Sequence, residues 1–120
     1  MDALGKLSPL VEALMNAATD RHRAVAANLA NVETPGYRAV GVKFDAALED
    51  AVREGDLEAL RGARAGTFRR DGKVKSNGND VDLDVELGEM NRNSLAYQTL
   101  MTAVMMRQQQ MRSAVAGRST

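Results

Sequence analysis

The sequence contains no cysteine and no tryptophan, and its aromatic side chains are limited to two phenylalanines and two tyrosines. Without cysteine, disulfide bonds and thiolate chemistry are both excluded. Large rings supply much of the core of a compact domain, so this scarcity predicts a thin core. Alanine, leucine, valine and seven methionines supply the apolar content instead, which favours long helix interfaces. Such a chain suits a subunit that buries apolar surface against its neighbours.

Net charge is also lacking, because 16 basic side chains balance 16 acidic ones. A balanced chain has no overall field that would attract it to nucleic acid or an anionic membrane, so neither partner is expected. No stretch approaches 18 uninterrupted apolar residues, so we expect no membrane span. Residues 1–6 show neither a basic region nor an apolar run, so no cleaved secretory signal is expected either.

Catalytic constellations are missing as well. His22 is the only histidine, and it lies between two arginines without the partners that a catalytic triad needs. The acidic run at residues 80–84 resembles the start of a calcium loop, but Val85 and Asn91 stand where that loop requires Gly and Glu. Carboxylates at this place favour the N-terminus of a helix instead. We therefore expect no enzyme activity, no cofactor and no metal.

A first helix is predicted over residues 7–32. Its apolar positions are spaced by three, four or seven residues, and they are Leu7, Val11, Leu14, Ala18, Val25 and Val32. Ser8 and Pro9 predict the start, because proline suits the first turn of a helix. Thr34, Pro35 and Gly36 predict the end, because Pro35 lacks a donor and restricts the residue before it.

A second long helix is predicted over residues 83–116. Ten positions alternate four and three residues apart, and they are Leu83, Leu87, Met90, Ser94, Tyr97, Met101, Val104, Gln108, Met111 and Val115. This heptad spacing predicts a coiled-coil seam. Leu95, Leu100, Met105 and Met106 lie beside the seam. The apolar surface is thus wider than a two-stranded coil needs, so more than one neighbouring helix could use it.

The insert at residues 38–82 has no long period. A short helix is predicted over residues 44–53, with Phe44, Leu48 and Val52 inward and Gly55 at its end. The Asp-Gly pair at 71–72 and the Asn-Gly pair at 77–78 favour tight hairpins. The expected fold is therefore a mainly α single domain spanning residues 1–120. Its long N- and C-terminal helices pair as an antiparallel coiled coil, with an irregular or β-hairpin insert between them.

Charge is distributed unevenly along the second half of the chain. Residues 61–75 carry an excess of basic side chains, and residues 80–89 carry an excess of acidic ones. One interpretation is two solvated faces. The other is head-to-tail complementarity between identical or related subunits, which would produce open helical packing. The sequence leaves both interpretations open.

A specific motif overlaps the end of the first predicted helix. Residues 28–38 closely resemble the "N-[IL]-A-N-x-x-T-P-G-Y-[KR]" signature of the axial proteins of the bacterial flagellum, which are the rod, hook and hook-associated subunits. The matching positions are Asn28, Asn31, Thr34, Pro35, Gly36 and Tyr37. The two asparagines can bond local backbone where the helix ends, Pro-Gly turns the chain, and the tyrosine supplies an anchor ring.

Later segments resemble the FlgB family of proximal rod proteins. Residues 44–48, 78–87 and 93–98 resemble its "D-F-x-x-x-L", "G-N-x-V-D-L-D-x-E-M" and "N-x-L-x-Y-Q" elements. The site residues carried over from the last two are Asn79, Val81, Asp82, Leu83, Tyr97 and Gln98. Leu87 and Ala96 depart from the pattern, and Ala96 leans towards the sister FlgC family, which stays an alternative. Hook and distal-rod subunits carry extra β domains, for which 120 residues leave no room.

The resemblance implies a structural subunit of the proximal rod, in the periplasmic part of the flagellar basal body. Family members assemble helically into the drive shaft that transmits torque and surrounds the export channel, and they are exported by the flagellar type III apparatus. The implied partners are copies of the chain, other rod proteins, the junction protein FliE between rod and MS ring, and the export gate. The motif residues would then set assembly geometry. The competing hypothesis is a soluble coiled-coil adaptor or export chaperone that does not polymerise.

Overall fold

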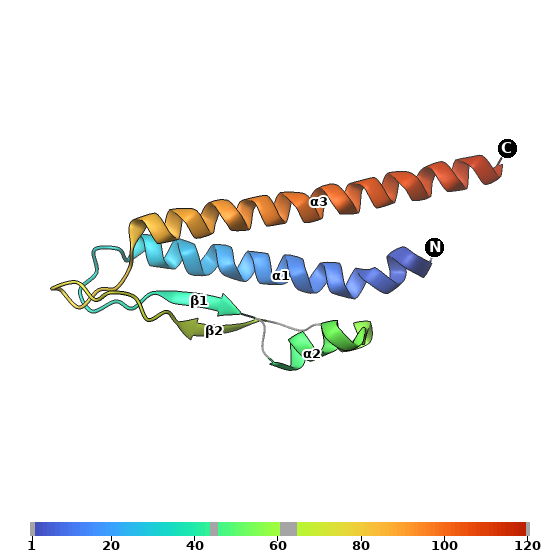
Figure 1. Ribbon diagram of the computed structural model, residues 1–120. Helices are drawn as coiled ribbons and strands as arrows, with labels where there is room; N and C mark the ends of the chain where they lie inside the picture. Colours follow the sequence, from blue (N-terminus) through green and yellow to red (C-terminus); the bar gives the residue numbers. More distant parts are fainter. Residues whose placement is uncertain (1, 44–45, 61–64, 120) are drawn as a thin grey trace.

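The fold was analysed in a computed structural model that describes residues 2–43, 46–60 and 65–119 (Figure 1). The chain is mainly helical, in agreement with the predicted fold class. The elements are α1 (Asp2–Ala30), β1 (Val40–Lys43), α2 (Ala46–Glu54), the 3-10 helix η1 (Leu57–Leu60), β2 (Gly66–Arg69) and α3 (Leu83–Ser119).

The two long helices define the shape of the molecule. α1 and α3 lie side by side and run in opposite directions, so the two termini lie at the same end (Figure 1). In Figure 1 the small sheet and α2 lie below α1, and β1 and η1 contact α1. The molecule is elongated, with extents of 70 × 26 × 17 Å. The antiparallel arrangement of the long helices agrees with the prediction, whereas their pairing as a coiled coil stays a prediction.

The start of the first helix was predicted incorrectly. α1 begins at Asp2, so Pro9 lies inside the helix instead of in its first turn. Proline has no N–H, so the backbone carbonyl of Gly5 lacks its usual intrahelical donor. The preference of proline for the first turn is statistical, and the helix tolerates this one missing bond. α1 ends at Ala30, close to the predicted end.

The predicted seam does not form a buried stripe within the chain. Met90, Met101, Val104 and Met111 are half-buried. Leu83, Leu87 and Val115 are 51%, 44% and 60% exposed, and Ser94 and Gln108 are also exposed. A straight α-helix drifts by about 20° per heptad relative to a 3.5-residue repeat, so a strict heptad stripe rotates away from a straight partner. Glu86, which is 1% exposed, lies on the buried side of α3 instead.

The insert contains a sheet that the turn signals did not predict. β1 pairs with β2 in antiparallel register, with Gly41 opposite Phe68. The connection between the strands contains α2 and η1, so it is not a tight hairpin. The Asn-Gly pair does form a turn, in which Gly78 N–H donates to Lys75 O at 2.9 Å and Gly78 has φ +82°. Strand pairing was therefore decided by contacts that are distant in sequence.

The predicted short helix exists, with a different inner face. Gly55, with φ +72°, ends α2 in a Schellman motif, in which Gly55 N–H donates to Val52 O and Asp56 N–H donates to Ala51 O. Val52 is 44% exposed, so the prediction that it points inward is wrong, and Ala51 is buried in its place. Phe44 lies outside the described residues, as does the Leu48 side chain.

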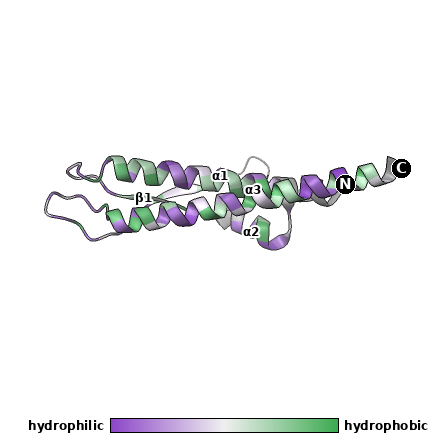
Figure 2. Cartoon of the chain, turned by 90° about the horizontal axis from the view of Figure 1, so that it is seen from above, coloured by the Kyte–Doolittle hydropathy of each residue, from purple (hydrophilic) through white to green (hydrophobic). Residues whose placement is uncertain are grey.

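The core is thin, as the composition predicted. The buried hydrophobic residues are mainly small, and on α1 they include Ala13, Ala17 and Ala18. Ala13 forms a cluster with Ala51 and Leu60, next to the half-buried Leu10. In Figure 2, hydrophobic and hydrophilic residues mix along both long helices, without segregation to one side. No helix in the described part of the chain has the length and hydropathy of a membrane-crossing segment.

Candidate assembly site

The end of α1 is shaped by the signature residues. Asn31 Nδ2 donates to Ala27 O at 2.8 Å, and Thr34 Oγ1 donates to Asn31 Oδ1 at 3.0 Å. Pro35 follows, and Gly36 adopts the left-handed conformation with φ +76°. Tyr37 N–H then donates to Thr34 O at 3.2 Å. These bonds turn the chain away from the helix axis and direct it into β1. Residues 28–38 and 77–82 together are called the elbow below.

Asn79 joins the two motifs that lie far apart in the sequence. Its side chain is fully buried, and Nδ2 donates to Asn31 O at 2.8 Å and to Thr34 O at 2.7 Å. Its Oδ1 accepts the N–H of Val81 at 2.7 Å. The amide therefore adds a second donor to two carbonyls of the turn after α1, each of which also accepts a backbone N–H. It also fixes the segment that leads into α3, so one side chain couples the directions of both long helices.

Two glycines allow the elbow to close. Gly36 N–H donates to Asn77 O at 2.9 Å. A Cβ added at Gly78 would lie 3.3 Å from the Cα of Gly36, and both residues have positive φ. Side chains are disfavoured in this backbone conformation, and this close approach leaves little space for one.

Asn28 is the centre of a network that connects three elements. Its Oδ1 accepts hydrogen bonds from Tyr37 OH and Val40 N–H, both at 3.0 Å. Its Nδ2 donates to Val40 O at 2.9 Å and to Glu86 Oε2 at 3.0 Å. The side chain is fully buried, and its full hydrogen-bonding capacity is used. The prediction that Asn28 bonds local backbone at the helix end is thus wrong, because the amide binds β1 and α3.

The network includes a buried ion pair. Arg70 Nη2 donates to Glu86 Oε1, and the same nitrogen lies 3.3 Å from Val40 O. The Glu86 side chain is 1% exposed. Arg70 Nε is buried and has no hydrogen-bond partner among the described residues. Sequence reasoning did not single out either residue. Glu86 lies between Val85 and Leu87 within the acidic stretch, so no local signal separates it from the neighbouring acids.

Two aspartates of the acidic run accept hydrogen bonds, one at the elbow and one at the start of α3. Asp80 Oδ2 accepts Arg38 Nε at 3.0 Å, and Asp80 Oδ1 accepts Ala39 N–H at 2.5 Å. Asp82 Oδ1 accepts the N–H groups of Asp84 at 3.0 Å and Val85 at 3.4 Å, which makes Asp82 the N-cap of α3. In the described part of the chain, no group of three or more His, Asp or Glu side chains is placed to hold a metal ion.

Two side chains of the elbow have shifted pKa values. Burial alone raises the pKa of the Asp80 carboxyl, but the bonds from Ala39, Arg38 and the Gly72 backbone lower the pKa below its ordinary value. Burial is also the main reason why the pKa of Tyr37 is raised, and the nearby carboxylate of Glu86 adds to this effect. The ionised form of Asp80 and the neutral form of Tyr37 are therefore the forms that stabilise the elbow.

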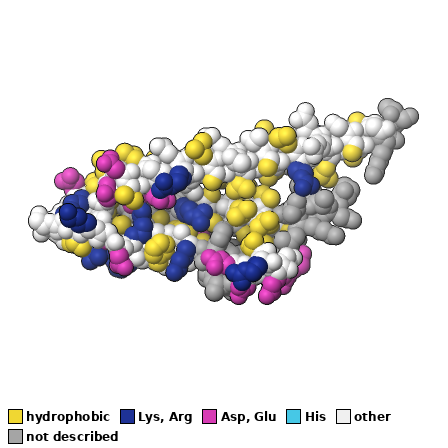
Figure 3. Space-filling view, in the orientation of Figure 1, with side chains coloured by type: hydrophobic (Ala, Val, Ile, Leu, Met, Phe, Trp, Pro, Cys, Tyr) yellow, Lys and Arg dark blue, Asp and Glu magenta, His cyan; other side chains and the backbone are white. Residues whose placement is uncertain are grey.

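The two charged stretches meet within one chain. The basic stretch contributes Arg70 to the pair with Glu86, and Arg38 pairs with Asp80 of the acidic stretch. Figure 3 shows Lys, Arg, Asp and Glu side chains at the elbow end and again in the region of α2, with hydrophobic side chains along the middle of the molecule. Part of the opposite charge is thus compensated internally. Complementarity between subunits stays a prediction for the charges that remain.

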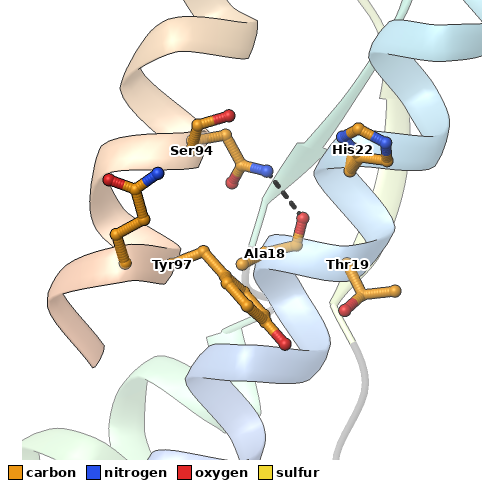
Figure 4. A pocket seen from close by; sticks show the side chains of 7 residues that line it. Ala18, Thr19, His22, Ser94 and Tyr97 are labelled. Carbon is orange, nitrogen blue, oxygen red and sulfur yellow. Dashed lines mark hydrogen bonds between the residues drawn. The ribbon is translucent and has the colours of Figure 1, made fainter. Parts of the chain in front are cut away.

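Tyr97 and Gln98 do not lie at the elbow. They line a groove of about 300 Å³ between α1 and α3, together with Ala18, Thr19, His22, Asn93 and Ser94 (Figure 4). Asn93 Nδ2 bridges the helices by donating to Ala18 O at 2.8 Å. His22 is exposed on α1. The sequence-derived site residues therefore fall into two regions: the elbow with the exposed Leu83 beside it, and this groove.

The chain is similar to flagellar basal body rod proteins of several bacteria. No protein-family model matches the chain. The flagellar basal body rod protein FlgB of Yersinia ruckeri is 30% identical over 106 residues, which cover 73% of this chain and 77% of the relative. The protein of the same name from Aeromonas hydrophila is 32% identical over 91 residues, which cover 66% and 69%. That of Bacillus subtilis (strain 168) is 27% identical over 100 residues, which cover 75% and 78%.

These relatives bear the FlgB name, which favours FlgB over the sister FlgC family. They match most of the chain at an identity of 27% to 32%. Together with the signature residues that meet at the elbow, they show that the chain belongs to the FlgB family of flagellar basal body rod proteins.

Proposed function

We propose that this chain is a structural subunit of the proximal rod. In this proposal, it is one rod-type domain that assembles helically with its neighbours into the drive shaft that transmits torque and surrounds the export channel. The observation that carries the proposal is an exposed, uncharged face of α3 that bears Leu95 and Met106, lies opposite the face packed on α1 and has no partner in the described part of the chain.

The two faces of α3 can be assigned from the helix geometry. Asn93 bonds Ala18, so its side chain points towards α1. Leu95 follows two residues later, a rotation of about 200°, and therefore points away from α1. Met106 lies eleven residues after Leu95, which is about three full turns, so it shares the outer face. Leu95 and Met106 are 64% and 56% exposed, as these positions require.

The outer face has the chemistry of an interface. Residues 93–106 contain no charged side chain on any face of the helix. A shallow hollow there is lined by Leu95, Gln98, Thr99, Thr102, Ala103 and Met106. A helix that is apolar on opposite sides is normally buried on both. Burial of this surface by a neighbouring helix would contribute roughly 25 cal/mol for each Å² of apolar area removed from water.

The elbow has a geometric role in this proposal. Its buried amides fix the angle between the helices and the sheet, so each subunit would present the α3 face in the same orientation. The exposed seam residues Leu83, Leu87 and Val115 would then contact other subunits. The partners in this proposal are copies of the chain, other rod proteins, FliE and the export gate. The location is the periplasmic rod, reached by flagellar type III export, and no catalytic activity is involved.

The proposal is tested in a bacterium that carries this gene as its only copy. Deletion should leave basal bodies with a membrane ring but no rod in electron micrographs of purified particles. Leu95→Glu combined with Met106→Glu should give the same defect while circular dichroism of the purified variant stays unchanged. The matched control Leu95→Met keeps the face apolar and should restore rods and swimming. Complete rods in the double Glu variant would contradict the assignment of this face.

The alternative is a soluble adaptor or export chaperone, and the two long helices would suit it as well. The two functions differ in location and in the effect of deletion. A rod subunit co-purifies with basal bodies, whereas an adaptor stays in the cytoplasmic fraction. If complete rods and hooks form after deletion and the protein fractionates with the cytoplasm, the adaptor function replaces the rod function.

A further inference from the structure

The short strand β2 has one free edge. All four of its residues are exposed, whereas β1 has three half-buried residues. Arg70 N–H donates to Ala39 O at 3.0 Å, so Ala39 and Arg70, which are the pair next to Val40 and Arg69, form a hydrogen-bonded antiparallel pair. Pair types alternate along the register, so the backbone groups of Thr67 and Arg69 point away from β1. These groups have no hydrogen-bond partner in the described part of the chain.

On the outer edge of β1, the outward backbone groups of Val40 have hydrogen-bond partners. Val40 N–H and Val40 O point away from β2, and the side chain of Asn28 bonds both. The outward backbone groups of Val40 on β1 are therefore hydrogen-bonded, whereas those of Thr67 and Arg69 on β2 are open to a partner. Unpaired groups on an edge strand are a template on which another extended segment can form hydrogen bonds.

A groove runs beside the free edge. It has a volume of about 520 Å³ and is lined by Gly36, Tyr37, Arg38, Val40, Thr67, Phe68 and Arg69. Side chains of an added strand that point to this face of the sheet would enter the groove. Phe68 remains 37% exposed, so it offers an apolar contact to residues of an added strand.

The charge near the free edge of β2 indicates which kind of segment can bind there. Arg69 is exposed on β2, and Lys43 lies with its Nζ 5.3 Å from the centre of the Phe68 ring. Lys73 follows shortly after the strand and is also exposed. A second copy of β2 would bring no carboxylate to pair with Arg69, because its four residues, Gly66–Arg69, include no acid. An acidic strand would gain from the same side chains.

We propose that the free edge of β2 binds an extended acidic segment of a partner protein, which adds a third strand to the sheet. The backbone of the partner bonds Thr67 and Arg69. Its carboxylates lie on the face of the sheet that carries Arg69 and the groove, and its apolar side chains lie on the opposite face, against Phe68. This interaction goes beyond the helix packing of the rod and does not depend on it.

The test uses the full chain in its monomeric form, two short peptides with blocked ends, and NMR. In one peptide Glu alternates with Val, and in the other Lys alternates with Val. The acidic peptide should shift the amide resonances of Thr67 and Arg69 and slow their hydrogen exchange, and the basic peptide should not. Equal effects of both peptides, or no effect of either, would overturn the proposal. Absence of cross-strand contacts between β1 and β2 in the free protein would also overturn it.

Matched variants separate the edge from the rest of the sheet. Thr67→Pro removes one outward N–H that takes no part in the pairing with β1, and edge strands tolerate proline at such positions. It should weaken binding of the acidic peptide roughly fivefold to tenfold, whereas Thr67→Val should have no effect. Arg69→Glu should transfer the preference to the basic peptide. Undiminished binding by both Thr67→Pro and Arg69→Glu would contradict the proposal, as would dimerisation that Thr67→Pro abolishes.

Discussion

Replacing Asn28 should be the most damaging single substitution of a side chain at the elbow. Asn28→Ala removes an amide that is fully buried and makes four hydrogen bonds, two as donor and two as acceptor. It leaves the Val40 N–H without its partner and withdraws a donor from the buried carboxylate of Glu86. The elements α1, β1 and α3 would lose their common connection.

The magnitude follows from these orphaned groups. A buried polar group that loses its partner costs about 1–3 kcal/mol, and more when it is charged. Val40 and Tyr37 are half-buried, so water can replace part of what they lose. We therefore expect a loss of about 3 kcal/mol in the free energy of unfolding. This is a large fraction of the roughly 5–15 kcal/mol that stabilises a typical domain.

Urea unfolding of the monomer, followed by circular dichroism, measures this loss. The matched control is Asn31→Ala, since Asn31 makes its two side-chain bonds to Ala27 and Thr34 in exposed positions. This control should cost about 1 kcal/mol or less, because water satisfies the groups left behind. If the two variants differ by less than about 0.5 kcal/mol, the central role of Asn28 is refuted.

A charge variant of the same position adds a pH signature. Asn28→Asp keeps an acceptor for Val40 but places a carboxylate where Nδ2 now lies 3.0 Å from Glu86 Oε2. Two carboxylates this close repel each other, so the folded state binds a proton more tightly than the unfolded state. The variant should therefore be least stable at neutral pH and regain stability relative to wild type on acidification. Asn28→Ala should show no such recovery.

Three further predictions concern the rest of the chain. Gly78→Ala should cost about 1–2 kcal/mol in chemical unfolding, because Gly78 has φ +82° and its Cβ would crowd Gly36, whereas Gly88→Ala within α3 should be neutral or stabilising by up to about 1 kcal/mol. The lowered pKa of Asp80 gives stability that is complete above its ordinary value of 3.8 and is lost as the pH falls through the folded-state value. Stability measured from about pH 6 to pH 2 should therefore fall less steeply in Asp80→Asn than in wild type. Leu60→Ala should cost about 2–4 kcal/mol, because Leu60 is 1% exposed in a small cluster, and hydrogen exchange should show the loss first in α2.

Each of these three has an outcome that would contradict it. Equal stability of the two glycine variants would show that the positive φ and the crowding at Gly78 carry no cost. Identical acid unfolding of Asp80→Asn and wild type would remove the ion pair and hydrogen bonds as the cause of the pKa shift. A loss in Leu60→Ala that spreads evenly over the whole chain would show that the small cluster is not a local unit.

Local chemistry in the sequence determined the elements with strong signals. The start of α3 follows from Asp82, whose carboxylate caps the first turn, and the end of α2 follows from Gly55. The scarcity of aromatic residues correctly predicted a thin core of small side chains. The signature at residues 28–38 located the turn after α1. These features depend on residues near one another in the chain, so periodicity and turn chemistry were sufficient to find them.

Tertiary structure alone decided which distant groups meet. The pairing of β1 with β2, the bonds of Asn28 to β1 and α3, and the buried pair of Arg70 with Glu86 join residues at least 12 positions apart. No local pattern predicts such partners, because a buried amide or ion pair is selected by the three-dimensional positions of its neighbours. The heptad stripe of α3 failed as a guide to internal burial for the same reason. Periodicity shows that a helix has an apolar stripe, but only the packing of α1 decides which part of it is covered within the chain.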